Sequence, residues 1–119
     1  MSEKLQIPST IVCPVDEELL QKLRRKQDEY LERMGKYAHP ELQLLQVPRE
    51  FFKYRILKTV LDEGQAELGE IIDQISKDLP EAYEVNKCYL SESWAVIWDY
   101  CANAGKHAVN SKTGQPSLV

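Results

Sequence analysis

The sequence predicts an all-α fold, a small bundle of four principal helices around a central helix at about residues 48–63. Three observations support this class. Apolar residues recur at helical spacing through most of the chain, and prolines and glycines stand where helices should begin and end. The third is the segment that runs from Pro48 to Gly64, which carries apolar residues over more than half of its helical circumference. A helix of this kind must be covered on more than one side, so we expect it to be the least exposed element of the fold.

The central helix has chemically marked ends and supplies the main core. Pro48 suits the first turn, where a missing N–H breaks no hydrogen bond, and Gly64 suits the left-handed position just past the last turn. Lys53 projects into the apolar arc. We expect its stem to cover apolar groups while its ammonium reaches water, and the alternative is a buried lysine with a lowered pKa. The predicted core residues of this helix are Phe52, Ile56, Leu57, Val60 and Leu61.

Helices on either side of this segment are predicted from the same signals. The first ends at Gly35 and has a face on which acidic and basic residues are interleaved, and the third is cleanly amphipathic and stops before Pro80. The last helix is expected to begin at Ser91 as its N-cap and to end at Gly105. The four principal helices are expected near residues 16–34, 48–63, 65–78 and 91–104, and a short helical connector near 41–46.

We predict one helical domain, residues 15–105, with an extended arm before it and a flexible tail after it. A chain of 119 residues can bury roughly two-thirds of its unfolded surface without a disulfide or a metal. The arm, residues 1–14, combines prolines with β-branched residues, which favour extended backbone, so the segment is expected to be an arm or a short strand. Its apolar side chains either pack on the chain's own helices or cross to a second subunit. The tail, residues 106–119, has no apolar periodicity.

Composition and charge limit the classes of partner. The net charge is −4, and an acidic surface repels phosphate backbones, so nucleic acid is not the expected partner. No apolar run approaches the roughly 18 residues of a membrane span, and no secretory signal opens the chain, which predicts an intracellular, cytoplasmic protein with no membrane contact. The three cysteines, Cys13, Cys88 and Cys101, lie at no metal-knuckle or dithiol spacing, so we expect reduced thiols.

Sequence motifs for catalysis are missing. The chain has no glycine-rich phosphate loop, nucleophile elbow, paired-histidine metal motif or acid-rich calcium loop. Its two histidines, His39 and His107, stand at a predicted turn and in the predicted tail. We therefore predict no catalytic residue, no cofactor and no metal. An enzyme whose site is assembled from distant residues is the third choice of function.

The first choice is a helical protein-binding or assembly module that recognises another protein, with self-association into a homodimer as the favoured form. The last helix carries more apolar residues than a small bundle needs to cover, and the alternative is one well-filled core. Large aromatic residues contribute disproportionately to binding. The candidate partner-binding residues are Trp94, Trp98, Tyr100, Tyr30 and Tyr37.

The second choice is a helix-turn-helix regulator that binds DNA. Residues 54–79 have the form of two helices joined at a glycine. A recognition helix should present basic or amide side chains on an exposed face, and the segment that follows offers two acidic residues beside one amide and one basic residue, Glu81, Glu84, Asn86 and Lys87. The helices fit this class and the charge does not.

Overall fold

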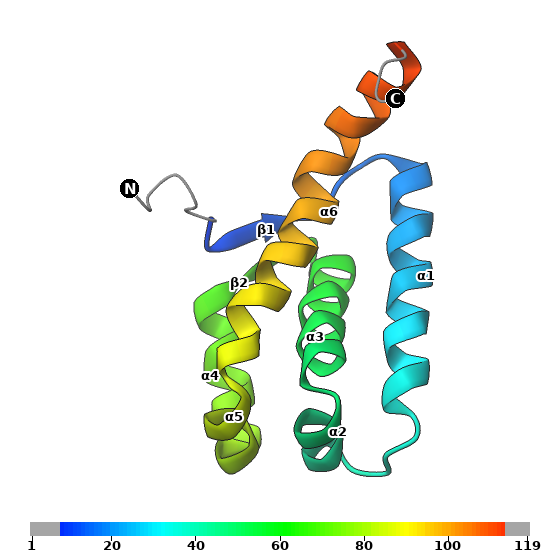
Figure 1. The fold of residues 1–119 in the computed structure, drawn as a ribbon. Helices are drawn as coiled ribbons and strands as arrows, with labels where there is room; N and C mark the ends of the chain where they lie inside the picture. The colour runs from blue at the N-terminus through cyan, green and yellow to red at the C-terminus, as the bar shows by residue number, and fades with distance from the viewer. Residues whose placement is uncertain (1–7, 114–119) are drawn as a thin grey trace.

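The computed structural model describes the backbone of residues 8–113 and the side chains of residues 8–102. In chain order the elements are β1 (Thr10–Val12), α1 (Glu17–Met34), α2 (Pro40–Gln46), α3 (Pro48–Glu63), β2 (Gln65–Glu67), α4 (Leu68–Asp78), α5 (Pro80–Asn86) and α6 (Cys88–Thr113). The fold is mostly helical, as predicted. Figure 1 shows α3 in the middle of the bundle, between α1 and the pair formed by α4 and α5. α6 packs across α3 and also contacts α1, α5 and β1.

α3 has the ends and the burial that its sequence predicts. Pro48 occupies the first turn. Gly64 follows the last turn with a φ of 87°, in the left-handed region, and its N–H donates to the carbonyl of Val60. α3 packs against α1, α2, α6 and β2, so it is covered on most sides. Of the predicted core residues, Phe52, Ile56, Leu57 and Val60 are fully buried and Leu61 is half-buried.

The core around α3 is partly aromatic. The ring of Phe52 meets Phe51 and Tyr83 edge to face, with ring centres 6.0 and 6.4 Å apart respectively. Lys53 is half-buried, and its ammonium lies 5.4 Å from the centre of the Tyr30 ring, where the negative face of the ring attracts it. Lys53 is therefore not a fully buried core residue.

A two-stranded sheet joins the arm to the middle of the chain. The extended backbone of β1 agrees with the prediction of an arm or a short strand, but its partner strand was not predicted. β1 and β2 pair antiparallel, with Ile11 opposite Ala66, and both of these residues are buried. The helix expected over 65–78 begins only at Leu68, because the three preceding residues form the strand that pairs with β1. The described part of the arm packs on the chain's own body, and residues 1–7 lie outside the part that the structure describes.

α6 differs at both ends from the helix predicted over 91–104. It begins at Cys88, so Ser91 lies inside the helix and is not its N-cap. It also runs through Gly105 instead of ending there. A glycine inside a helix costs roughly 1 kcal/mol relative to alanine, which weakens a helix without ending it. The backbone of α6 thus covers residues 106–113, which we assigned to the tail.

α1 and α2 lie close to their predicted spans. Asp16 caps α1, because its carboxylate accepts a hydrogen bond from the N–H of Glu18 at 3.0 Å. α2 coincides with the connector predicted near 41–46 and, like α3 and α5, has a proline in its first turn. Of the predicted tail, residues 114–119 lie outside the described part of the chain.

Candidate docking surface

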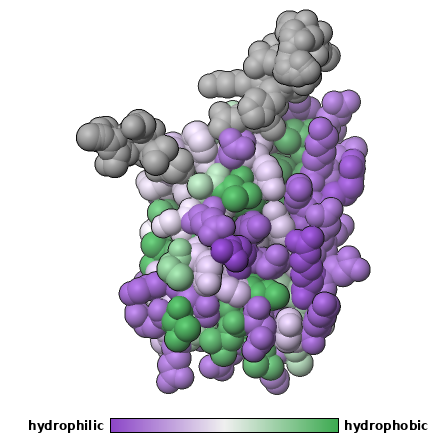
Figure 2. Space-filling model, in the orientation of Figure 1, coloured by the Kyte–Doolittle hydropathy of each residue, from purple (hydrophilic) through white to green (hydrophobic). Residues whose placement is uncertain are grey.

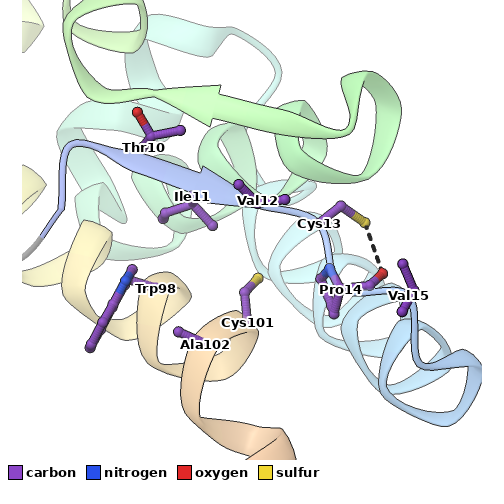
Figure 3. A pocket seen from close by; sticks show the side chains of 9 residues that line it. All are labelled: Thr10, Ile11, Val12, Cys13, Pro14, Val15, Trp98, Cys101 and Ala102. Atoms are coloured by element: carbon purple, nitrogen blue, oxygen red, sulfur yellow. Dashed lines mark hydrogen bonds between the residues drawn. The ribbon is translucent and has the colours of Figure 1, made fainter.

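A groove of about 450 Å³ lies between α6 and the segment of residues 10–15, which contains β1. Figure 3 shows β1 running between β2 on one side and, on the other side, the turns of α6 that carry Trp98, Cys101 and Ala102. The groove therefore borders the edge of β1 that faces away from β2. We call it the β1–α6 groove, and its walls are residues 10–15 and these three residues of α6.

The β1–α6 groove is uncharged. None of its lining residues carries a charge, although 29% of the residues in the chain are charged. Two of the lining valines are open to solvent: Val12 is 62% exposed and Val15 is 96% exposed. Scattered apolar residues are normal on a protein surface. Exposed valines beside an uncharged groove form one continuous apolar area instead, and such an area is typical of a contact surface.

β1 presents an unpaired backbone edge to this groove. On its other edge, the carbonyl of Ser9 accepts the first N–H of α4 at 2.8 Å, and the N–H of Cys13 donates to the carbonyl of Gly64 at 2.9 Å. Backbone groups alternate in direction along a strand, so Thr10 and Val12 point their N–H and C=O groups away from β2. Within the described part of the chain β1 pairs only with β2. The edge at the groove is therefore open to a further strand.

Two cysteines of the groove wall behave as small apolar groups. Burial, and secondarily the neighbouring Cys13 thiol, raise the pKa of Cys101 to about 12. Burial also raises the pKa of Cys13, against the opposing effect of Arg24. Both thiols are thus protonated at neutral pH and are poor nucleophiles. All three cysteines of the chain are free thiols, as predicted.

Two of the five predicted partner-binding residues lie in the core. Trp94 is buried, and its indole N–H donates to the carbonyl of Pro8 at 2.8 Å, which ties the middle of the arm to α6. Tyr30 is also buried, and its pKa is raised by burial first and then by the neighbouring hydroxyl of Tyr100. Within one chain, neither Trp94 nor Tyr30 exposes appreciable surface.

The other three predicted residues keep part of their surface exposed. Tyr100 is half-buried, with the ammonium of Lys26 5.2 Å from the centre of its ring. Tyr37 is half-buried after α1, and its carbonyl accepts a hydrogen bond from Gln43 at 3.1 Å. Of the five, Trp98 is the one that lines the β1–α6 groove.

The sequence reasoning missed the two valines that the groove exposes. For Val12 a signal was present, because it belongs to the apolar run of the arm, whereas Val15 lies beyond the predicted arm of residues 1–14. What the run did not reveal is which of its side chains face the solvent. That depends on the strand with which β1 pairs, because side chains alternate between the two faces of a strand.

The structure gives no sign of a metal centre in its described part. A cavity of about 240 Å³ near α2 and α5 is bordered by the carboxylates of Glu41, Asp78 and Glu81. Among the residues whose side chains are described, however, no three His, Cys, Asp or Glu side chains are grouped closely enough to hold a metal ion. The carboxylates make this end of the molecule acidic.

The link between α3 and α4 bears on the helix-turn-helix alternative. The two helices are joined by Gly64 and β2, and β2 is held in a sheet by β1. Helix-turn-helix domains join their helices by a short turn. The length of the link suits such a motif, but the link forms a paired strand, so it lends that alternative no support.

Comparisons of the chain with family models, with curated proteins and with solved structures find no significant match. Within the chain's described residues, no helix has both the length and the hydropathy that crossing a bilayer requires.

Proposed function

We propose that this chain is a helical protein-binding module that associates with a second copy of itself, and that the β1–α6 groove is the contact surface. The observation that carries this proposal is the continuous uncharged area formed by the groove and by the exposed Val12 and Val15. Apolar area of this kind gains free energy when a partner removes it from water.

Charge does not oppose a second copy at this groove. The net charge of the chain is −4, so two copies repel each other over much of their surface. An uncharged groove lets the copies approach without placing like charges across the interface, which would cost free energy. A two-fold arrangement then uses the same surface on both copies.

Other parts of the surface are less suited to self-association. Figure 2 shows hydrophilic residues over α1, and hydrophobic patches at the end of the molecule that carries α2 and α5. The exposed large hydrophobic residues of α2 and α5 are Leu42, Leu45 and Val85. These two helices also carry Glu41 and Glu81, which border the acidic cavity. Two copies that met at this end would bring like charges together.

The two valines alone would not hold a dimer together. Burial of apolar surface contributes about 25 cal/mol per Å², whereas association costs several kcal/mol of lost freedom and stable interfaces bury about 800 Å² per partner. Trp98 is half-buried in the groove wall, and large aromatic residues of this kind carry much of the binding energy at interfaces. We therefore expect the groove, its valines and Trp98 to act together.

Sedimentation equilibrium at tens of micromolar protein tests this proposal. We expect the intact chain to have the mass of a dimer. Val15→Asp should weaken the dimer at least about tenfold, which corresponds to about 1.4 kcal/mol, because it places a charge in the apolar contact. Val15 is 96% exposed, so the new carboxylate leaves the core of the single chain intact.

The matched control is Val85→Asp. It adds the same charge at a valine that is 69% exposed, on α5 and away from the groove. By sedimentation equilibrium this variant should have the mass of a dimer, like the intact chain. A monomeric intact chain would contradict the proposal, and so would equal weakening by the two variants.

A further inference from the structure

We propose that the β1–α6 groove is filled by strand addition, with residues 4–7 of a second copy lying along the open edge of β1. This inference rests on the proposed function, because it names the segment by which each copy enters the other. Each copy would contribute one arm and one groove, and a two-fold axis would relate the two contacts.

The open edge of β1 supplies hydrogen bonds for such a strand. Thr10 and Val12 direct their backbone groups away from β2, toward the groove. A strand added there would pair with both N–H and both C=O groups of these two residues. Backbone bonds of this kind give affinity, and the pockets beside the strand give specificity.

The sequence of the arm matches the walls of the groove. In an extended segment Leu5 and Ile7 lie on one face, and Lys4 and Gln6 lie on the other. The apolar face would meet the uncharged wall that contains Trp98, while the polar face would meet water. The groove of about 450 Å³ is also within the usual size of a binding pocket, roughly 300 to 1,000 Å³.

The chain's own arm is poorly placed to fill its own groove. The carbonyl of Pro8 is held by the Trp94 indole at 2.8 Å, which fixes where the arm leaves the body. To run back along β1 in a tight hairpin, the arm would have to reverse at Pro8 and Ser9. Two-residue hairpin loops need a positive φ at their first position, whereas proline is fixed near −65°. A longer loop would include Ile7 and the residues before it, so these residues could not pair with β1.

The length of the arm suits exchange between copies. Seven residues precede Pro8, and an extended segment of that length spans up to about 25 Å. The axes of packed helices lie about 8 to 10 Å apart. An extended arm of this length is therefore long enough to pass one helix and the helix packed against it. The arm of one copy can therefore cross a two-fold interface and lie in the groove of the other.

Charges placed in the arm test this occupant in the full chain. Leu5→Asp with Ile7→Asp puts two carboxylates on the face that would enter the groove. Ser2→Asp with Gln6→Asp adds the same charge on the opposite face of the same segment. By sedimentation equilibrium, we expect the first pair to weaken the dimer at least about tenfold and the second pair to change it less than about twofold.

A substitution in the groove gives the complementary variant. Ala102→Arg places a long charged side chain in the groove wall at an exposed position of α6. Arginine is a good helix former, so circular dichroism should show an unchanged fold. Ser91→Arg makes a comparable change at an exposed position near the start of the same helix. We expect Ala102→Arg to be a monomer and Ser91→Arg to remain a dimer.

Mixing the arm variant, Leu5→Asp with Ile7→Asp, with the groove variant Ala102→Arg distinguishes exchange of arms between copies from an arm that folds back on its own chain. In a mixed dimer the arm variant supplies an intact groove, and the groove variant Ala102→Arg supplies an intact arm. One of the two contacts is thereby restored. We expect native mass spectrometry of the mixture to show a mixed dimer that neither variant forms alone. An arm that fills its own groove would give no such recovery.

The outcomes distinguish this inference from the proposed function. If Val15→Asp breaks the dimer and Leu5→Asp with Ile7→Asp does not, the occupant is not the arm, and self-association through the groove stands without it. If mixing restores no dimer, exchange of arms is wrong. If the intact chain is a monomer, both the proposed function and this inference are wrong.

Discussion

α3 and α6 are the two helices whose sequences carry the widest apolar arcs, and the fold treats them differently. α3 is packed against α1, α2, α6 and β2, and Ile56 and Leu57 are fully buried. α6 buries Trp94 and Ile97 in the same core, but it leaves Trp98 in the wall of the groove. One helix therefore uses its apolar residues inside the chain, and the other leaves part of them at an open surface.

The difference shows that the width of an apolar arc does not separate core from contact surface. What separates them is the set of elements packed around each helix, and that set is a property of the whole fold. β1 covers part of α6 and leaves the groove beside it. Substitutions in the middle of α3, at its C-terminal glycine and in the groove wall test how far the two regions differ.

The largest effect is expected in the middle of α3. Leu57→Ala should lower the free energy of unfolding by about 2 to 5 kcal/mol, because it removes the contacts of a fully buried side chain and leaves a cavity. This is a large part of the roughly 5 to 15 kcal/mol typical of a small domain. Urea unfolding followed by circular dichroism measures it. Leu61→Ala, at a half-buried position of the same helix, should cost less. An unchanged midpoint for Leu57→Ala would show that α3 is not the centre of the core.

A smaller effect is expected where α3 ends. Gly64→Ala should lower the free energy of unfolding by about 1 to 2 kcal/mol, because alanine adopts the left-handed region only at a cost and the φ of Gly64 is 87°. An added Cβ would meet no atom within 4 Å, so the cost comes from the backbone alone.

Gly69→Ala is the control for this substitution. Gly69 lies in α4, and a Cβ added there would also meet no atom within 4 Å. Because Gly69 is helical, alanine should stabilise the fold by roughly 0.5 to 1 kcal/mol. The same urea measurement should therefore give opposite signs for the two variants. Equal signs would contradict the left-handed cap at Gly64.

Local signals predicted the helices well, but of the sheet they indicated only the extended backbone of the arm and not its partner strand. Pro48 and Gly64 fix the ends of α3 because each acts on its immediate neighbours. β2 has residues that also suit a helix, and its pairing joins Glu67 to Thr10, 57 residues away in sequence. Pairing over such a distance depends on how the rest of the chain is folded and not on local propensity.

The candidate site was predicted only in part, and for a related reason. Trp94 and Trp98 are one turn apart on the same broad apolar arc, so both were chosen as partner-binding residues. The structure places Trp94 in the core and Trp98 in the groove wall, because the former faces the interior and the latter faces the open edge of β1. Val12 belongs to the apolar run of the arm, but its exposure is defined only by the pairing of β1 with β2. Val15 lies beyond β1 and outside the predicted arm.

The smallest change in stability is expected in the groove wall, at Cys101. The fold raises the pKa of this thiol from 9.0 to about 12, chiefly by burial, so the folded state favours the protonated form. Below the unfolded pKa both states keep the proton, and the contribution of the thiol to stability is fully present. As the pH rises toward the folded pKa the unfolded state loses its proton first, so this contribution is lost. The change is limited because Cys101 is only half-buried, so water still reaches part of the thiol.

Urea unfolding at about pH 8 and about pH 10.5 measures this contribution in the parent, in Cys101→Ala and in Cys88→Ala. Cys101→Ala lacks the titrating group, so it should lose less stability than the parent between the two pH values. Cys88→Ala should follow the parent, since Cys88 is exposed at the start of α6. Equal losses in all three proteins would mean that Cys101 is as open to water as Cys88. In that case β1 would not shield α6, and the groove would not differ from bare helix surface.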